Sequence, residues 1–406
     1  MDNLIRKIVE ESIESSLPDK AVTRELKNLP ELKGRKVLIA IGKAAYQMAK
    51  TALESDIKFD QAVVITKYNH LKTNLENAVC FEAGHPISDE NTIKASQYAY
   101  DLVGNLTEDD LVVMLISGGG SALFEIPLIS FEEIQDINKQ LLKKGADIVE
   151  INTIRKRLSK IKGGKFARHC YPAKVYNIIL SDVIGNRPDM IASGPTYEDF
   201  STCEDALNIV NKYGLILSEA ARKCLNEETE KNLTNITTKI SGSVDQLCLK
   251  VKEILEDEGY KTDILTTFMD CQAKEAGYIL SSIAKSKSAY KDRLAYIFGG
   301  ETIVKIKGNG KGGRNQELAL ASAKHIRGLK NVQIISFSSD GTDGPTDAAG
   351  AFVDGYTMDK LKEKNINYYE LLDNNDSYNA LNKIGQLIKT GPSGTNVNDV
   401  SIVLIN

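Results

Sequence analysis

Short apolar runs and stretches of helical period alternate through the first half of the chain. Apolar runs rich in β-branched residues predict buried strands at residues 37–41, 62–65, 111–116 and 175–180. Apolar positions at helical spacing predict helices between these runs, at residues 44–54, 91–104, 131–144 and 152–162. This alternation predicts an α/β fold with a mainly parallel sheet that is covered by helices on both faces. Ligands of such sheets bind at the carboxyl ends of the strands.

A second series of elements follows a polar stretch rich in Thr and Asn, residues 226–243, which we interpret as a linker. Helices are predicted at 245–257, 273–286 and 315–326, and strands or extended segments at 263–268, 294–298, 302–307, 332–338 and 401–405. The chain has 406 residues, more than one hydrophobic core usually supports. We therefore expect two domains, residues 1–240 and a smaller α/β domain at 241–406.

Charge and composition exclude several classes of partner. The net charge is only -4, so no general positive field exists to hold a nucleic acid or an anionic membrane. The 6 cysteines include no CxxC pair, which fits a reducing compartment, and the N-terminus lacks the pattern of a signal peptide. The most apolar stretch, residues 111–116, is too short to cross a bilayer. We expect a cytoplasmic protein with a small ligand.

Two loops at predicted strand ends are suited to phosphate. Lys43 follows Gly42 where a helix opens, and a lysine at this positive end of a helix is best explained by a bound anion. The next such loop is glycine-rich and flanked by hydroxyls: Ser117, Gly118, Gly119, Gly120 and Ser121. Glycines let backbone N–H groups turn toward an oxyanion. The alternatives are a solvated lysine and a flexible loop.

The predicted helix 152–162 has Asn152 as its N-cap, and its first turn is basic, the unfavourable sign for the helix dipole. By spacing, Arg155, Ser159 and Lys162 share one face, which forms either an anion-binding stripe or a solvated basic face.

The loop after the strand 175–180 carries Asp182 and Asp189. Carboxylates of this kind are ligands for Mg²⁺, but such residues also build turns for purely local reasons.

A glycine loop in the second half of the chain follows Glu301 and leads to Arg314 and Asn315. Residues 308–313 formally match GxGxxG, and Asp340 follows the next predicted strand, where an acid could contact the ribose of a dinucleotide. A dinucleotide-binding site is therefore one interpretation of this loop. Against it, residues 302–307 alternate like an exposed strand. The loop also carries Lys311 beside Arg314, and paired cations suit phosphoryl transfer better. The polar loops 338–350 and 390–399 fit a polyol or nucleotide site, or plain turns.

Taken in order, these motifs resemble the glycerate 2-kinase family: GKAA (42–45), GHPxxDE (84–90), SGGGSAL (117–123), the NxxRK helix that ends in KGG, SDVxG with IASGPT, GGE (299–301), KGGRNQE (311–317), SSDGTDGPTDAAG (338–350) and TGPxGTNVND (390–399). The resemblance implies an N-terminal Rossmann-like αβα sandwich, a smaller C-terminal MOFRL-type domain and an active site in the cleft between them. It also implies transfer of the γ-phosphoryl group of ATP to the 2-hydroxyl of D-glycerate, with Mg²⁺.

Carried over residue by residue, the resemblance makes Lys43 and Arg314 the catalytic residues. We expect substrate and nucleotide contacts from the residues of the serine-glycine loop (117–121) and from Arg155, Glu301, Asn315 and Asp340, and metal contacts from Asp182 and Asp189. One departure is the sequence Gly185-Asn186-Arg187, where the family pattern leads us to expect a second acid. The sequence does not determine the oligomeric state, and a homodimer is left open.

Two other functions remain to be weighed. An NAD(P)H-dependent hydroxypyruvate reductase is supported only by the GxGxxG match at 308–313. A non-catalytic sugar-phosphate sensor would keep anion-binding loops, but it would need neither metal-binding acids nor cations in two domains.

Overall fold

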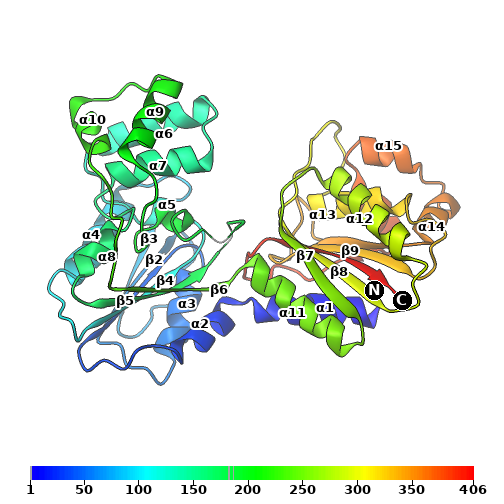
Figure 1. Ribbon diagram of the computed structural model, residues 1–406, viewed down its shortest axis with the longest axis horizontal. Coiled ribbons are helices and arrows are strands. Elements are labelled where there is room, and N and C mark those ends of the chain that lie inside the picture. Colours follow the sequence, from blue (N-terminus) through cyan, green and yellow to red (C-terminus); the bar gives the residue numbers. More distant parts are fainter. Residues whose placement is uncertain (1, 182, 186) are drawn as a thin grey trace. The chain divides into compact units, whose positions relative to one another are not determined.

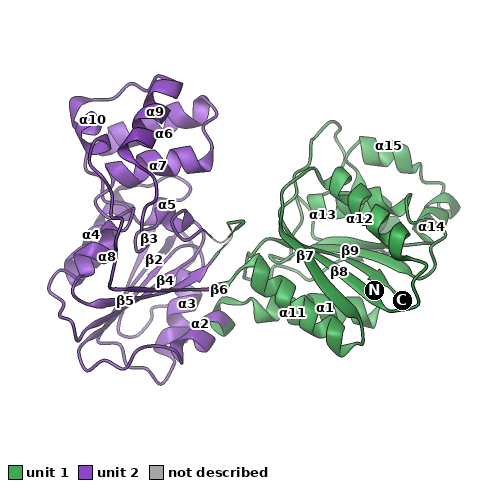
Figure 2. Cartoon of the chain, viewed as in Figure 1, with its two compact units in different colours: residues 1–20, 181–186, 242–406 green, residues 21–180, 187–241 purple. Residues whose placement is uncertain are grey.

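The structure, a computed structural model, describes residues 2–181, 183–185 and 187–406, and the chain divides into two compact units (Figure 2). Unit 1 comprises residues 1–20, 181–186 and 242–406, and unit 2 comprises residues 21–180 and 187–241. The N-terminal residues therefore pack with the second half of the chain. The domain division at residues 240 and 241 stays a prediction.

Unit 2 is built on a parallel sheet with the strand order β3-β2-β1-β4-β5-β6. The strands are β1 (Lys36–Ile41), β2 (Gln61–Lys67), β3 (Ala78–Ala83), β4 (Leu111–Ile116), β5 (Lys174–Leu180) and β6 (Ile236–Gly242). This order confirms the predicted Rossmann-like sheet. The order reverses between β1 and β4, and the carboxyl ends of these two neighbours are the place where such sheets form a ligand crevice.

Helices cover both faces of this sheet, and a further group of helices forms a cluster of its own (Figure 1). On one face, α2 (Pro18–Leu26) and α3 (Ala45–Leu53) bury Val22, Met48 and Ala52 against β1, β2 and β4. Figure 1 shows α4 (Glu90–Leu102) and α8 (Lys165–Cys170) on the other side. The helical cluster has its own apolar core and contains α6 (Phe131–Lys143), α7 (Ile148–Leu158), α9 (Cys203–Tyr213) and α10 (Glu219–Leu225).

The predicted helix 152–162 is wrong at both ends. The observed helix α7 begins at Ile148, where Asp147 and Glu150 form a capping box, and it ends at Leu158. Arg155 therefore lies in the last turn, where a positive charge is favourable to the helix dipole. The expected stripe of Arg155, Ser159 and Lys162 is also wrong, because Ser159 is the C-cap and Lys162 lies beyond the helix.

Unit 1 is built on a mixed sheet with the order β11-β10-β9-β12-β8-β7, in which β7 and β8 are the only parallel pair among the described residues. Its strands are β7 (Lys261–Met269), β8 (Leu294–Gly300), β9 (Val332–Ser338), β10 (Gly350–Asp354), β11 (Leu387–Ile388) and β12 (Asp399–Ile405). The last of these strands, β12, lies between β8 and β9 at the centre of the sheet. This mixed sheet agrees with the expected second α/β unit.

Two apolar cores enclose the sheet of unit 1. On one face, α12 (Ala273–Lys287) and α13 (Arg314–Ala323) pack together with the short helices α14 (Thr357–Glu363), α15 (Tyr368–Asp373) and α16 (Ser377–Lys383). On the other face, α1 (Asn3–Ser15) and α11 (Val244–Asp257) bury Ile5, Ile8 and Val251 (Figure 1). The N-terminal helix is thus part of the core of unit 1.

Two segments differ from the sequence-based expectation. Residues 302–307 form no strand, because Asn375 fixes their backbone by accepting from Lys307 N (2.7 Å) and donating to Lys305 O (3.3 Å). The expected linker 226–243 contains β6, whose Thr residues alternate between exposed and half-buried positions at the edge of the sheet. No helix among the described residues is long and apolar enough to cross a bilayer.

Candidate active site

Lys43 and the serine-glycine loop lie side by side at the point where the strand order of unit 2 reverses. Lys43 N donates to Gly118 O (2.9 Å), and Ala44 N donates to Ser117 Oγ (3.0 Å). Gly42 has φ 112° and passes so close to the loop that a Cβ atom would come within 2.3 Å of Ser117 Oγ. The two predicted phosphate loops therefore form one structure.

Cationic and imidazole side chains gather around this loop. A Cβ atom at Gly119, whose φ is 88°, would lie 3.0 Å from the His85 ring and 3.3 Å from Lys43 Cγ. His70 Nδ1 lies 3.1 Å from Lys43 O. The pKa of His85 is lowered first by burial and then by the nearby Lys43, Lys67 and His70. The ends of β1 and β2 thus place two lysines, Lys43 and Lys67, near the His85 ring, and this positive setting suits an anion.

The backbone of the loop offers further donors. Among the described residues, none accepts a hydrogen bond from the N–H groups of Gly118, Gly119 or Ser121. Successive free N–H groups in a turn that contains a left-handed residue form an anion-binding concavity. Together with Lys43, they can take up the oxygens of a phosphate group.

A chain of buried polar side chains supports the loop from behind. Ser193 Oγ lies 3.0 Å from Ser121 Oγ and 2.9 Å from Asn152 Oδ1. Ala192, Ser193 and Gly194 all have positive φ values, of 52°, 59° and 58°. Such strained backbone persists only where its surroundings hold it, and it is common at functional sites.

Arg155, the predicted binding residue of α7, reaches toward α6 instead of standing free. Its Nε donates to Asn138 Oδ1 (2.7 Å), and burial lowers the pKa of its guanidinium, an effect that Glu125 partly offsets. The neighbouring Lys162 is fully buried and pairs with Glu125 (3.0 Å). These basic residues serve the packing of unit 2, and a binding role for Arg155 stays a prediction.

Arg314 is the first residue of α13 in unit 1, and acids hold its guanidinium on two sides. Nε and Nη2 donate to the two oxygens of Asp399 at 2.5 and 3.0 Å, and Nη1 lies 3.1 Å from Glu301 Oε1. Asp399 begins β12, opposite Gly300 and Ser338, the last residues of β8 and β9. Glu301 and Arg314, predicted from different motifs, therefore meet at one edge of the sheet.

Two acids near Arg314, Asp399 and Asp343, are buried, and burial raises their pKa values. Burial raises the pKa of Asp399 by more than the Arg314 hydrogen bonds lower it. Burial also raises the pKa of Asp343 to about 6, although that carboxylate accepts from the backbone of Asn315 and Gln316 at the start of α13. The pKa of Arg314 is raised despite its burial, because Asp399 accepts from it and adds its charge. The guanidinium stays charged in a fixed orientation.

The other predicted residues of unit 1 have local roles in the structure. Asn315 is buried, and its Oδ1 accepts from Ser336 Oγ (2.6 Å). Asp340 follows β9, and one of its oxygens accepts from Ser338 Oγ (3.0 Å) and Thr342 N (2.8 Å), which closes a turn. Their contacts with a ligand stay predictions.

The glycine loop 308–313 does not have the features of a dinucleotide site. Cβ atoms at Gly308, Gly310 and Gly312 would come within 2.3–2.5 Å of Asn374, Asp376 or Ser377. The glycines are therefore required by close packing against residues 374–377, and they do not open toward a pyrophosphate. No strand of the sheet leads directly into this loop either. The physical support for a nicotinamide site is thus lost.

Only one of the two predicted metal ligands, Asp189, lies within the described residues. Asp182 lies outside the described residues. Asp189 is buried, and its carboxylate pairs with Arg187 (2.7 Å) and Lys156 (3.5 Å). No group of three or more His, Cys, Asp or Glu residues that could hold a metal ion occurs within the described part of the chain. A metal role for Asp189 stays a prediction.

Several residues around Lys43 and around Arg314 were not predicted as site residues. His85 lies in the GHPxxDE motif, Asp343 in the loop 338–350 and Asp399 at the end of TGPxGTNVND, so their motifs were visible. Their partners could not be predicted from the sequence. The register that places Asp399 beside Gly300 and Ser338 arises only because β12 pairs antiparallel with both β8 and β9. Lys67 and His70 carry no motif.

The fold and these loops define a class: an α/β protein with a Rossmann-like unit, a glycine-rich loop at its switch point and a second mixed-sheet unit. Two family models match this arrangement, "Domain of unknown function (DUF4147)" over residues 4–226 and the MOFRL family over residues 294–399.

Known proteins narrow the class. The chain is 49% identical over 414 residues to the D-glycerate 2-kinase of Thermotoga maritima, which covers 100% of this chain and 98% of that protein. A crystal structure of glycerate kinase from Thermotoga maritima superposes with a TM-score of 0.94, at 49% identity and with 99% of each chain covered. A protein of Agrobacterium vitis provisionally named hydroxypyruvate reductase is 36% identical and covers 99% of this chain and 94% of its own length. The chain belongs to the glycerate 2-kinase family.

Proposed function

We propose that this chain transfers the γ-phosphoryl group of ATP to the 2-hydroxyl of D-glycerate, giving 2-phosphoglycerate and ADP. The observation that carries the proposal is the relationship, over the whole chain, to a protein named D-glycerate 2-kinase. In the reaction, the 2-hydroxyl oxygen forms a bond to the γ-phosphorus. The bond from that phosphorus to the oxygen bridging to the β-phosphate breaks, and one proton is released.

Lys43 and the serine-glycine loop are assigned to the transferred phosphoryl group. The free N–H groups of Gly118, Gly119 and Ser121 supply fixed donors, and Lys43 supplies a positive charge beside them. Phosphoryl transfer is catalysed mainly by positioning and by neutralising the charge of the transferred group. Donors that are fixed before the reaction do this without reorganisation.

Arg314 is assigned to the same charge or to the glycerate carboxylate. Asp399 holds Nε and Nη2, so only the Nη1 side, next to Glu301, is turned away from that clamp. An anionic ligand would replace Glu301 as the partner of this nitrogen. We infer that Lys43 and Arg314 act on one pair of substrates.

Mg²⁺ accompanies ATP in this proposal, and when bound it would neutralise the β- and γ-phosphate oxygens. Asp189 does not fit as a direct ligand in its present contacts, because both its oxygens face the cations Arg187 and Lys156. No step is therefore derived through the metal. If Asp189 does act in metal binding, Asp189→Asn will raise the Mg²⁺ concentration required for half-maximal activity.

The reaction is tested by supplying D-glycerate with ATP and Mg²⁺, and in parallel hydroxypyruvate with NADH. We expect ADP formation, no oxidation of NADH, and a product whose phosphate couples to the C2 proton in NMR spectra. Turnover of NADH with hydroxypyruvate would contradict the proposal, as would a phosphate on C3. Binding of glycerate or ATP with no turnover would favour a sensor.

The two assigned cations are tested by substitution. Lys43→Ala and Arg314→Ala should each lower kcat by a factor on the order of 10²–10³, as for the loss of one charge-stabilising group. Lys50→Ala and Arg327→Ala are the matched controls, since each removes an exposed cation from an exposed ion pair in the same unit. Full activity in a folded Lys43 or Arg314 variant would rule out the assigned role.

The cellular setting of the enzyme follows from the same proposal. All six cysteines are free thiols in the structure, which is consistent with the cytoplasm, where ATP is available. A cytoplasmic location and a homodimer stay predictions.

A further inference from the structure

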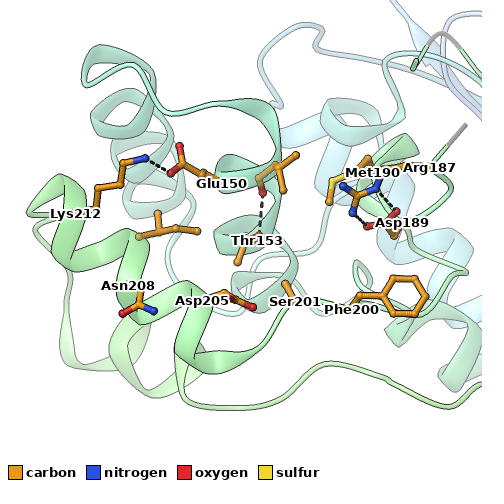
Figure 3. Close-up of a pocket in the computed structure, with 12 residues that line it drawn as sticks. Glu150, Thr153, Arg187, Asp189, Met190, Phe200, Ser201, Asp205, Asn208 and Lys212 are labelled. Carbon is orange, nitrogen blue, oxygen red and sulfur yellow. Dashed lines mark hydrogen bonds and ion pairs between the residues drawn. The ribbon is translucent and has the colours of Figure 1, made fainter. Parts of the chain in front are cut away.

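A pocket of about 540 Å³ lies between α7 and α9 in unit 2, apart from Lys43 and the serine-glycine loop (Figure 3). Its size lies within the range of small-molecule sites. Its walls combine apolar side chains, which are Val149, Met190, Phe200 and Ile209, with the neutral polar side chains of Thr153, Ser201 and Asn208. None of these residues was singled out from the sequence.

Four of the five charged residues that line the pocket cancel in two ion pairs. Arg187 pairs with Asp189 (2.7 Å) and Lys212 with Glu150 (2.5 Å), and Figure 3 shows these two ion pairs at opposite ends of the pocket with Thr153 between them. The fifth charged residue, Asp205, accepts from the backbone and hydroxyl of Thr202 at the start of α9. Among the described lining residues, no cation is left for an anion. The pocket therefore suits a neutral group, and a small acid such as glycerate would find no partner there.

Phe200 gives the pocket an aromatic surface. The residue is 66% exposed, and it lies near the Arg187–Asp189 end of the pocket (Figure 3). Its ring forms an edge-to-face pair with the Tyr197 ring, with ring centroids 6.3 Å apart. An exposed aromatic ring beside apolar walls and amide and hydroxyl groups is suited to stacking on a heteroaromatic base.

Hydrogen bonds connect this pocket to the phosphate loop. Met190 forms part of the pocket wall, and its carbonyl lies 3.5 Å from Asn152 Nδ2. Asn152 Oδ1 in turn lies 2.9 Å from Ser193 Oγ, which is 3.0 Å from Ser121 Oγ in the loop. The wall of the pocket and the loop thus belong to one buried hydrogen-bond network. Met190, which begins this network, lies at the same end of the pocket as Arg187 (Figure 3). A molecule with a neutral ring system and an anionic tail would satisfy both places.

We propose that this pocket binds the nucleoside part of the phosphoryl donor, the base stacking on Phe200, with the phosphates directed to the serine-glycine loop. The inference rests on the proposed kinase function, which supplies a donor of this chemical class. It assigns Phe200 to donor affinity and gives it no part in the bond-making step.

The test compares Phe200→Ala with Phe200→Tyr and with Ile216→Ala, which removes an 81% exposed apolar side chain of the same unit that does not line the pocket. Stacking contributes about 1–3 kcal/mol per base, so Phe200→Ala should raise the KM for ATP roughly 5- to 150-fold. The KM for glycerate at saturating ATP should stay constant, and Phe200→Tyr and Ile216→Ala should behave like the unaltered chain.

Direct binding separates the base from the phosphates. In calorimetric titrations, Phe200→Ala should weaken binding of adenosine by the same factor and leave binding of inorganic tripolyphosphate unchanged. Equal ATP KM values for a folded Phe200→Ala and the unaltered chain would overturn the pocket assignment while the kinase assignment stands. Absence of ADP formation by the unaltered chain would instead overturn the kinase assignment itself.

Discussion

The clamp between Asp399 and Arg314 makes a quantitative prediction about unit 1. Asp399→Asn keeps the shape of the side chain but removes its charge and turns one acceptor into a donor. Arg314 then keeps one hydrogen bond, while its other N–H faces an amide N–H in place of an oxygen at 2.5 or 3.0 Å. A hydrogen bond to a charged group contributes about 1.5–3 kcal/mol net.

Two further effects set the size of the loss. Removing one partner of a buried ion pair costs about 3–5 kcal/mol. Here the side chain of Arg314 is 26% exposed and can be partly hydrated, and burial already raises the pKa of Asp399, so loss of its charge recovers some desolvation energy. We therefore expect the unfolding free energy to fall by about 2–3 kcal/mol. We also expect kcat to fall, because the guanidinium loses its fixed orientation.

Urea unfolding followed by circular dichroism measures this change, and the chain contains no tryptophan that would report on it by fluorescence. Asp347→Asn is the control, because Asp347 pairs with the exposed Lys389 at 3.0 Å and its side chain is 62% exposed. The control should unfold at the midpoint of the unaltered chain. Equal midpoints for Asp399→Asn and the unaltered chain would refute the reasoning, as would equal shifts in both variants.

Three other predictions follow from features of the two units. Gly42→Ala should lower the unfolding free energy of unit 2 by about 3 kcal/mol or more, because it adds a clash with Ser117 to the strain of a positive φ. Gly145→Ala is the control, because Gly145 has φ 76° and nothing within 4 Å of its Cβ position, and in the same urea assay it should cost only about 1–2 kcal/mol. Lys162→Met should cost about 3–5 kcal/mol by leaving buried Glu125 without its cation, and the double variant with Glu125→Leu should recover most of this loss; a double variant as unstable as the single one would contradict the pairing. Burial raises the pKa of Asp343 to about 6, so the folded state binds the proton of this carboxyl group more tightly than the unfolded state does. The contribution of Asp343 to the unfolding free energy should therefore decrease by roughly 2–3 kcal/mol as the pH rises from about 4 to about 6. The difference between unaltered chain and Asp343→Asn in unfolding free energy should show this decrease, and a difference independent of pH over this range would show that the carboxyl group is not buried in this way.

The sequence pattern predicts most strands of both sheets, but it misses β3, β6, β10 and β11 and does not predict the order in which the strands pair. The β-branched runs at 37–41 and 111–116 predict buried strands, and the observed strands β1 and β4 match them closely. The mixed order of the second sheet could not be read from periodicity, because an antiparallel central strand and a parallel one are equally apolar. The alternating Thr residues of β6 are those of an edge strand, and high polarity conceals such a strand among loop residues.

The same division applies to the candidate site. Lys43 and the serine-glycine loop were predicted because one glycine-rich loop at a strand end carries its own chemical signal. The error in α7 arose from the basic residues Arg155 to Arg157, since the box of Asp147 and Glu150 marks the true start. Burial of Lys156 and Lys162 was also not predictable, because it depends on the partners Asp199 and Glu125, which are distant in sequence.

The position of α1 in unit 1 has a consequence for synthesis of the chain on the ribosome. Ile5, Ile8, Val9 and Ile13 pack against α11 and the sheet that β12 completes, all of which are translated after the whole of unit 2. The sheet of unit 2 can assemble as it emerges, whereas α1 must wait with its apolar face exposed to water. A nascent chain halted just after residue 241 would thus carry a folded unit 2 and an unpartnered N-terminal helix, a natural target for chaperones.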